Sequence, residues 1–399
     1  MKEKIKQLSK EYLSEVISFR RHIHQNPELG FEEYNTTKFI QEQLNNMGLT
    51  NHKVALKRTK TGVYVDIDSN KPGKTVLFRA DIDALPLEEE SNVEYKSNVK
   101  GVAHMCGHDG HIANLLGVAK ILLQLKDSFK GKVRLLFQPA EEGPDMGGCV
   151  EVVNEKEVLN GVDFALGFHV YGAGNFGKAY FKYGPMYASF IDWDIKIKSN
   201  GGHCSEPHKS ADPIIIGSQA INLFQSILTK IKSPLDNAVL AVGTFNGGSN
   251  SNVIPTEATM TGTIRTYDLE LGRTIVSKMK SIMNSLCELY NGTYESNFLE
   301  GYPPLINNNQ LTKFVMNETI SLLGKDNVKE IDHPTFGCED FSYIANEVPS
   351  CYFKIGIHKE NEIEPLHHSG SFEWDDSVLE TSMAVSANAI ISFLNAITK

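Results

Sequence analysis

The chain has 399 residues, a length that predicts two domains rather than one small core. Its composition, 41% hydrophobic and 22% charged, is typical of a soluble globular protein, and its net charge of −10 argues against nucleic acid as a partner, because no basic excess can neutralise phosphates. No uninterrupted apolar run approaches the roughly 20 residues needed to cross a bilayer, so we expect no membrane partner.

The cysteines and the N-terminal segment predict a cytoplasmic protein. Six cysteines are scattered without the close spacing of a disulfide framework. The first residues open an amphipathic helix and lack the apolar core of a secretory signal. We therefore expect free thiols in a reducing compartment.

The first half of the chain alternates between helical and strand-like patterns. Apolar residues at helical spacing predict helices over 3–23, 32–47 and 111–126. Short apolar runs, typical of strands buried on both faces, cover 75–80, 132–138 and 163–170. This alternation predicts an α/β domain with a mostly parallel sheet flanked by helices.

The pattern changes near Gly184-Pro185 and changes back after Tyr302-Pro303-Pro304. Between these points, 190–198 and 258–267 alternate apolar and polar residues, which is typical of strands with one open face, and 211–231 and 270–290 are helical. We expect an inserted α+β domain of βαββαβ, ferredoxin-like topology over 186–299. Helices at 310–324 and 377–397 and a strand at 351–357 then complete a discontinuous main domain, 1–185 and 300–399.

The segment His104-Met105-Cys106-Gly107-His108-Asp109-Gly110-His111 contains three imidazoles, a thiol and a carboxylate. Such a cluster is costly to bury unless a positive charge lies among the groups. Imidazole and thiolate are preferred ligands of Zn, Co and Ni, and Mn fits where carboxylates join them. We interpret the segment as a metal site at the start of a buried helix; the alternative is a helix N-terminus that is merely rich in histidine.

Further polar groups follow the predicted strands, where α/β proteins place their sites. They are Asp81 and Asp83, Glu141 and Glu142, His169, and the pair His367-His368 ahead of the last helix. Adjacent glutamates point different ways, so one can bind a metal while the other takes a proton from water, as metal-assisted hydrolysis requires. Taken singly, the aspartates fit a solvated turn and His169 a core histidine. Their agreement with the metal-like segment favours one site.

Eight stretches carry a family resemblance. They are RRHIHQNPELG (20–30), RADIDALP (79–86), CGHD (106–109), QPAEEG (138–143), GGH (201–203), NVIP (252–255), GTIRT (262–266) and EDF (339–341). In this order and spacing they resemble the dimetal aminoacylase/carboxypeptidase family, in the branch of hippurate hydrolases, indole-acetyl-amino-acid hydrolases and N-acetyl-diaminopimelate deacetylases. Together they cover nearly the whole chain.

The resemblance implies two divalent metals, Zn or Mn in the first place and Co or Ni as alternatives. The ligands that it implies are Cys106, His108, Glu142, His169 and His368. His368 lies four residues before the aromatic Phe372, as in relatives, whereas counting from the preceding leucine favours His367. Glu141 falls on the family's general base. The aspartate that supports the metals falls on Asp81 or Asp83, and both stay open.

The resemblance also implies that the insert is a lid and dimerisation domain. Its substrate-contacting positions fall on His203, Asn252 and Arg265, and we expect a homodimer in which His203 reaches the partner's metals. Glycines 201 and 202 let His203 project from a loop, and Arg265 can bind a carboxylate with two hydrogen bonds, although by itself it fits a surface charge. The chain departs from its relatives at Val170-Tyr171-Gly172, Cys204 and Ser369-Gly370, near the expected pocket.

These observations predict a metal-dependent amidohydrolase that cleaves small N-acyl-L-amino acids to a carboxylic acid and an amino acid. Glu141 would take the proton of a water activated by the metals, and the metals with His203 would stabilise the oxyanion. A dipeptidase or carboxypeptidase of the same family is the enzymatic alternative. A non-catalytic metal-binding scaffold is the alternative from another class, and Glu141 beside a complete ligand set argues against it.

Overall fold

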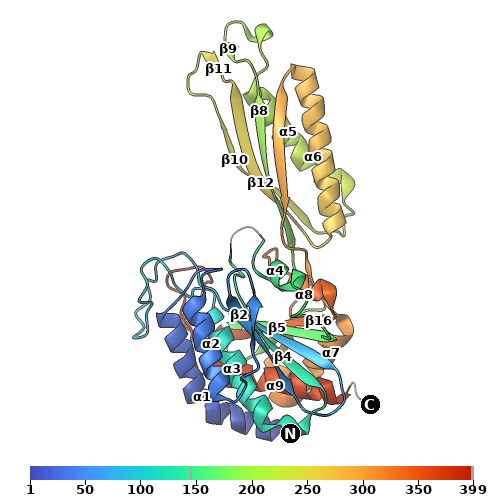
Figure 1. Cartoon of the computed structure of the whole chain (residues 1–399). Coiled ribbons are helices and arrows are strands. Elements are labelled where there is room, and N and C mark those ends of the chain that lie inside the picture. The colour runs from blue at the N-terminus through green and yellow to red at the C-terminus, as the bar shows by residue number, and fades with distance from the viewer. Residues whose placement is uncertain (144–145, 397–399) are drawn as a thin grey trace. The chain divides into compact units, whose positions relative to one another are not determined.

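The computed structural model describes residues 1–143 and 146–396, and the chain divides into two compact units (Figure 1). The first unit comprises Met1–Met186, Ile306–Pro334 and Asp340–Lys399, and the second comprises Tyr187–Leu305 and Thr335–Glu339. No sequence pattern indicated that 335–339 belongs with the second unit.

A mixed eight-stranded sheet forms the centre of the first unit, in the order β1-β2-β4-β3-β5-β16-β6-β15. These strands are β1 (Lys53–Leu56), β2 (Thr61–Asp68), β3 (Thr75–Asp81), β4 (Lys132–Gln138), β5 (Phe164–Asn175), β6 (Ala179–Phe181), β15 (Val328–Glu330) and β16 (Ser350–His358). The central strands β4, β3, β5 and β16 are parallel, whereas β2 pairs antiparallel with β1 and β4, and β6 antiparallel with β16. The predicted α/β class is confirmed, with antiparallel additions towards the edges.

Helices cover this sheet. They are α1 (Lys2–Gln25), α2 (Tyr34–Asn46), α3 (His108–Gln124), α4 (Cys149–Asn154), α7 (Asn309–Leu323), α8 (Ser342–Glu347) and α9 (Val378–Ala396), with short 3-10 turns at Lys126–Ser128 and Lys325–Asn327. Helices α1, α3 and α9 pack against one another (Figure 1). Helix α3 is apolar on nearly all sides and buried over most of its length, as the continuous apolar run predicted.

Helix α3 begins at His108, three residues earlier than the apolar pattern indicated. Gly107 precedes it with a φ of 94°, a left-handed conformation that favours glycine. Asp109 lies in the first turn, where a negative charge favours the helix N-terminus. His108 and His111 are therefore both helical and share one face, three residues apart.

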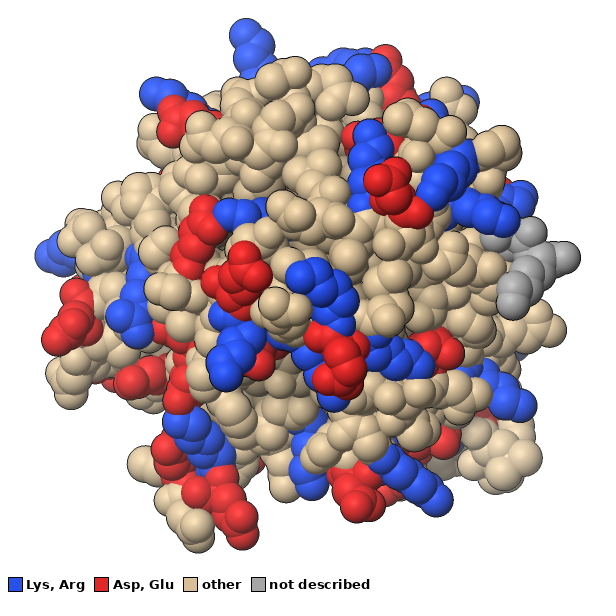
Figure 2. Space-filling model, turned by 90° about the horizontal axis from the view of Figure 1, so that it is seen from below, with Lys and Arg blue, Asp and Glu red and all other residues tan. Residues whose placement is uncertain are grey.

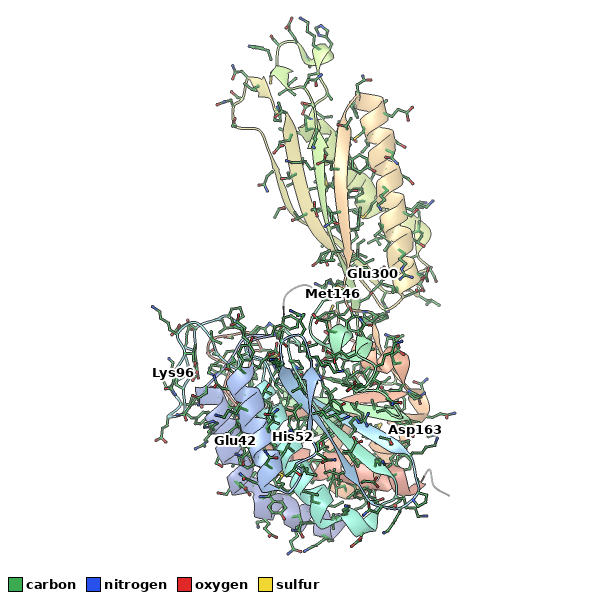
Figure 3. The ribbon with its side chains drawn as sticks, in the orientation of Figure 1. Glu42, His52, Lys96, Met146, Asp163 and Glu300 are labelled. Carbon is green, nitrogen blue, oxygen red and sulfur yellow. The ribbon has the colours of Figure 1, made fainter. Side chains whose placement is uncertain are left out.

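The starts of β3 and β5 are joined by Asp163, which Figure 3 labels. Its carboxylate accepts hydrogen bonds from Lys74 Nζ at 2.7 Å and from the backbone N–H of Thr75 at 2.9 Å. The two strands therefore start in register, so Asp81, the last residue of β3, lies level with His169 in the middle of β5.

The second unit has the predicted βαββαβ order. Its elements are β8 (Ser189–Lys198), α5 (Pro213–Ile231), β10 (Ala238–Gly247), β12 (Glu257–Thr266), α6 (Leu269–Tyr290) and β13 (Thr293–Glu300). The antiparallel sheet has the order β10-β12-β8-β13, and its apolar face packs with α5 and α6 around Trp193 and Phe224. The short strands β9 (Gly202–His203) and β11 (Val253–Ile254) pair with each other, and a 3-10 turn covers Pro207–Lys209. Strands β7 (Gly184–Tyr187) and β14 (Leu305–Asn307) lie where the chain leaves and re-enters the first unit.

Helix α5 is the one helix among the described residues whose length and hydropathy would suffice for a membrane span, and 28% of that window is buried. Ile216, Ala220 and Phe224 face the core of the second unit. On its other side Ile215 is 44% exposed and Leu223 is 40% exposed. The helix is thus apolar on a face that nothing within its own unit covers.

Charges of both signs are interspersed on the face of the molecule that Figure 2 shows. Lysine and arginine side chains alternate with aspartate and glutamate there, and apolar and polar residues lie between them. This distribution is typical of a solvated surface.

A close contact at Gly110 generates a stability prediction. A Cβ at Gly110 would lie 2.5 Å from two ring carbons of Trp374, whose ring is stacked 3.6 Å from the guanidinium carbon of Arg20 and cannot move freely. We expect Gly110→Ala to lower the free energy of unfolding by about 1–3 kcal/mol. In the control Gly243→Ala the nearest atom is 3.7 Å away, and we expect less than about 0.5 kcal/mol. Equal losses in urea titrations of the two variants would contradict this account.

Candidate metal centre

Six predicted site residues meet at the carboxyl ends of the central strands. Three groups of potential ligand atoms each lie within 4.8 Å of one another: Cys106, His108 and His169; Cys106, Glu142 and His368; and His108, Glu141 and Glu142. Cys106 belongs to the first two groups, so its sulfur lies between two sets of donors. The donors come from α3 and the residues just before it, from β5, and from the segments after β4 and β16, which are far apart in the sequence.

The imidazole of His108 is oriented for a metal. Its Nδ1 lies 3.0 Å from the carbonyl oxygen of Asp83 and 3.3 Å from the carboxylate of the same residue. Nδ1 therefore donates a proton to these oxygens, and Nε2 is the nitrogen left for a metal. That Nε2 is buried without a hydrogen-bond partner in the described structure, although buried polar atoms are normally bonded. A divalent cation fits this donor set.

Asp81 and Asp83 both support the centre, each in its own way. Asp81 accepts a hydrogen bond from Arg79 at 2.6 Å and one from Nδ1 of His111 at 2.5 Å. Asp83 orients His108 and also accepts the backbone N–H of Glu142 at 2.7 Å. Burial opposes ionisation of Asp81, but His108, Arg79 and His111 outweigh it and keep the pKa of Asp81 well below its usual value. Asp81 is therefore a carboxylate.

His111 is a site residue to which sequence reasoning assigned no role. Its Nε2 accepts the backbone N–H of Val170 at 3.0 Å, and its ring centre lies 4.5 Å from that of His169. His111 thus connects Asp81 to the strand that carries His169. The signal for this role is its helical spacing of three residues from His108.

The C-terminal histidines differ in their surroundings. Nε2 of His368 lies 2.8 Å from Oε1 of Glu142, and the Cys106 and Glu142 side chains raise the pKa of His368 to about 10. Nε2 of His367 instead accepts the backbone N–H of Gly172 at 3.2 Å, and burial lowers the pKa of His367 to about 3. The groups of potential ligands in the described residues include His368 and omit His367.

Two of the potential ligands, Cys106 and His169, favour their neutral forms. Burial raises the pKa of the Cys106 thiol, and burial likewise disfavours the charged form of His169, whose pKa is well below its usual value. A bound divalent cation reverses this tendency for a thiol, because it stabilises the thiolate directly.

A second polar cluster anchors the first turn of α3. Asp109, fully buried, accepts hydrogen bonds at 2.9 Å from Arg20 and from Nδ1 of His24. Nε2 of His24 lies 3.1 Å from Glu89, and Arg20 also pairs with Asp376. These bonds fix the turn that carries His108.

The second unit contains His203, Asn252 and Arg265. His203 and Asn252 lie close together, whereas Arg265 lies apart from them. His203 pairs with Val253 across the β9–β11 ladder, and Nδ1 of His203 accepts hydrogen bonds from Ser205. Arg265 lies near the end of β12, where it stacks 5.1 Å from the ring centre of Phe190 and donates to Cys338 Sγ at 2.6 Å. The β9–β11 pair adjoins Thr256, the residue directly before the start of β12. His203 and Arg265 are therefore separated by roughly 27 Å, the length of eight strand residues.

Comparison with known proteins gives consistent matches. The model of peptidase family M20/M25/M40 matches residues 77–392. Thermostable carboxypeptidase 2 of Saccharolobus solfataricus is 39% identical over 98% of this chain and 99% of its own length. The N-acyl-L-amino acid amidohydrolase of Geobacillus stearothermophilus is 42% identical over 77% of this chain and 81% of its own. A crystal structure of a dinuclear metal-binding peptidase of the M20 family from Bacillus subtilis aligns with a TM-score of 0.83 and 30% identity, over 96% of this chain and 99% of that one.

The buried His24 generates a prediction for the pH dependence of stability. Burial disfavours its cation, but Asp109 and Glu89 outweigh this and raise the pKa of His24 to about 9. Because the unfolded value is about 6.5, the stabilisation is fully present below pH 6.5 and is lost as the pH rises through about 9. We expect the unfolding free energy of the wild type to fall by roughly 3 kcal/mol relative to His24→Gln across this range, at about 1.4 kcal/mol per pH unit. Parallel pH profiles of the two proteins in urea titrations would contradict the assignment.

Proposed function

Because the chain belongs to peptidase family M20/M25/M40, we propose that it is a metal-dependent hydrolase of small N-acyl-amino acids. The amidohydrolase from Geobacillus supports this substrate class, since it is 42% identical. The observation that carries the chemistry is the convergence of Cys106, two glutamates and three histidines on one edge of the sheet. The six cysteines are free thiols, which fits a cytoplasmic location.

Five side chains would bind two divalent metals: Cys106, His108, Glu142, His169 and His368. Cys106 belongs to both groups of donors, so we assign it the position shared by the two ions. His368 is preferred to His367, because His367 already uses Nε2 to accept the Gly172 N–H. Metals bound there would lower the pKa of a water molecule and polarise the scissile carbonyl, and Zn or Mn fits this donor set first, with Co or Ni as alternatives.

Glu141 is the general base in this proposal. It is the remaining carboxylate of the cluster, with Oε2 at 4.0 Å from Nε2 of His108, and it need not be a ligand when Glu142 is one. Asp83 accepts the Glu142 N–H, and Asp81 orients His111, so both aspartates act by positioning. Glu141 would accept the proton of the attacking water and pass it to the leaving amine.

A carboxypeptidase is the second candidate, because the chain is 39% identical to a protein of that name along nearly all of its length. Both activities attack an amide next to a free carboxylate, and Arg265 would contact that carboxylate in either case, whereas Asn252 lies beside His203 and would contact the substrate together with it. Turnover of N-acetyl-, N-benzoyl- and longer N-acyl-amino acids against matched dipeptides distinguishes them. Preference for dipeptides would contradict the main proposal.

We further propose that the protein is a homodimer formed through the second unit. Strand β10 is an edge strand, and Val239 on it is 38% exposed, while α5 exposes Ile215 and Leu223. Such edges and apolar faces are usually covered. The separation of His203 and Arg265 along β12 adds a second reason, because a small substrate cannot contact both side chains from one copy. His203 would then serve the partner's site and stabilise the oxyanion there.

Removal of metal tests the proposed function. Chelation should abolish hydrolysis, because activation of the water and polarisation of the carbonyl both depend on the bound metals in this proposal. Adding Zn, Mn, Co or Ni should restore turnover to differing extents. Full activity of the demetallated protein, with metal content checked by elemental analysis, would overturn the proposal.

Separate substitutions of Glu141 and Glu142 distinguish the general base from the metal ligand. Glu141→Gln should keep the metals and lose turnover by a factor on the order of 10² to 10⁴, because the amide cannot accept a proton. Glu142→Gln should lose metal, because a ligand and the partner of His368 is changed. Metal content and kcat are measured on both variants. Loss of metal in Glu141→Gln and retention of metal in Glu142→Gln would assign the base to Glu142 and the ligand to Glu141.

Complementation tests the role of His203. Inactive Glu141→Gln and inactive His203→Ala are mixed under conditions that exchange subunits, so that each heterodimer contains one site with both groups intact. Random exchange should restore roughly a quarter of the wild-type activity. The mixture of Glu141→Gln with Glu142→Gln is the control, because both changes lie in the first unit and exchange repairs no site. No recovery, despite exchange seen by mass spectrometry, would show that His203 does not act on the partner.

A further inference from the structure

Glu33 is a fully buried carboxyl group that the proposed mechanism does not use. It lies directly before α2, and its Oε1 accepts the backbone N–H of Ala140 at 2.7 Å. Its Oε2 is buried without a hydrogen-bond partner in the described structure. Burying a carboxyl group with one oxygen unbonded is costly, so this position needs an explanation beyond packing.

Glu33 binds the backbone N–H of Ala140, the residue directly before Glu141. Ala140 has a φ of 57°, in the left-handed region that residues other than glycine rarely adopt. Such a conformation persists only where the surroundings determine it. The carbonyl of Ala140 accepts the N–H of Gly148 at 2.6 Å, and Glu33 binds the N–H on the other side of the residue. Glu33 therefore helps to keep the backbone at Ala140 in this conformation.

Two buried carboxyl groups flank Glu141. Glu33 accepts the N–H of Ala140, and Asp83 accepts the N–H of Glu142 at 2.7 Å. The segment that carries Glu33 can come this close because residue 30 is glycine: a Cβ there would lie 3.0 Å from Cα of Gly143 and 3.2 Å from Ala140. The peptide group before Ala140 and the one after Glu141 are thus anchored independently.

The two carboxyl groups cannot both be ionised without cost. Burial and the charge of Asp83 raise the pKa of Glu33 to about 8. Glu33 is therefore largely protonated at neutral pH, and its hydrogen bond to Ala140 needs an acceptor oxygen rather than a charge. A glutamine can supply that oxygen.

We infer that Glu33 is a positioning residue for Glu141, which it places by binding the N–H of Ala140. The inference rests on the proposed function, in which Glu141 is the general base. Within the described part of the chain, the side chain of Glu33 is hydrogen-bonded to the backbone of Ala140 and to none of the proposed ligands, so it acts through the backbone on the orientation of Glu141. Misplacing a catalytic group by about 1 Å can cost on the order of 10²-fold in rate.

Three substitutions of Glu33 distinguish the position of its acceptor oxygen from the charge of its carboxyl group. Glu33→Gln keeps the acceptor oxygen at the same distance, and its kcat should stay within about threefold of the wild type. Glu33→Asp keeps the carboxyl group but withdraws it by roughly 1.5 Å, and Glu33→Ala removes it. Both should lower kcat per metal-loaded molecule by roughly 10- to 100-fold, with KM and metal content unchanged. If Glu33→Ala fails to fold, the contrast between the Gln and Asp variants decides.

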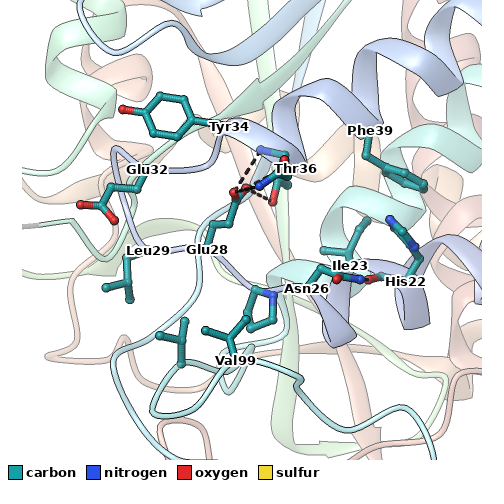
Figure 4. Close-up of a pocket in the computed structure, with 13 residues that line it drawn as sticks. His22, Ile23, Asn26, Glu28, Leu29, Glu32, Tyr34, Thr36, Phe39 and Val99 are labelled. Carbon is teal, nitrogen blue, oxygen red and sulfur yellow. Dashed lines mark hydrogen bonds between the residues drawn. The ribbon is translucent and has the colours of Figure 1, made fainter.

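Glu28 offers a matched control on the same segment. Figure 4 shows its carboxylate capping the start of α2, where it accepts the N–H groups of Asn35 and Thr36 at 3.0 and 2.8 Å. Glu28→Ala should lower the melting temperature and leave kcat per metal-loaded molecule unchanged. A purely structural role of Glu33 would give the same pattern in its variants, and that result would overturn the inference.

A double-mutant cycle completes the test. If Glu33 acts through Glu141, then Glu33→Asp should cost less than about threefold further when Glu141 is already Gln, because residues that act as a unit are not additive. Full additivity, or metal loss in Glu33→Asp, would overturn the inference. If Glu141→Gln is inactive while Glu33→Asp is fully active, only this inference fails. If Glu141→Gln is fully active, the proposed base is wrong and this inference falls with it.

Discussion

The buried guanidinium of Arg79 is the constraint on which the site depends. It has no exposure to solvent, and it donates to Gln138 at 2.8 Å, to Asp81 at 2.6 Å and to Asp340 at 2.7 Å. A buried charge is tolerated only when it is paired and fully bonded, so the ends of β3 and β4 and the segment after 339 cannot move apart independently. Asp81 extends this network through His111 to the N–H beside His169. The arrangement of ligands is therefore a consequence of charge pairing beneath them.

Backbone conformation contributes the second part of this arrangement. Three residues at the centre have positive φ angles: Gly107 at 94°, Ala140 at 57° and His368 at 62°. Each adjoins or is a proposed site residue, and two are not glycine. The N–H of His368 donates to the carbonyl of Met105 at 2.8 Å, as that of Ala140 donates to Glu33. These bonds offset the unfavourable conformations, and the donor atoms are directed before any metal arrives.

Local sequence patterns predicted the helices and strands. The site residues that these patterns missed depend on contacts between residues distant in the sequence. Apolar runs placed β3, β4 and α5 within two residues, because burial on one or both faces leaves a direct periodicity. The roles of Glu33 and His111 depend on partners 107 and 59 residues away, at Ala140 and Val170. The sequence left Asp81 and Asp83 as alternatives, and both are hydrogen-bonded to proposed site residues or their neighbours: one pairs with Arg79 and His111, the other with His108 and the Glu142 N–H.

The two units divide the chemistry between them, and this division bears on substrate choice. The first unit contains every proposed ligand and the proposed base. The second contains the groups proposed to contact substrate, and Arg265 there already donates to Thr263 and Cys338 and stacks on Phe190. A guanidinium fixed in this way is pre-organised for a carboxylate, because less side-chain entropy is lost on binding. Recognition of the amino-acid half of a substrate would thus be rigid, whereas the acyl half has no such fixed partner among these residues.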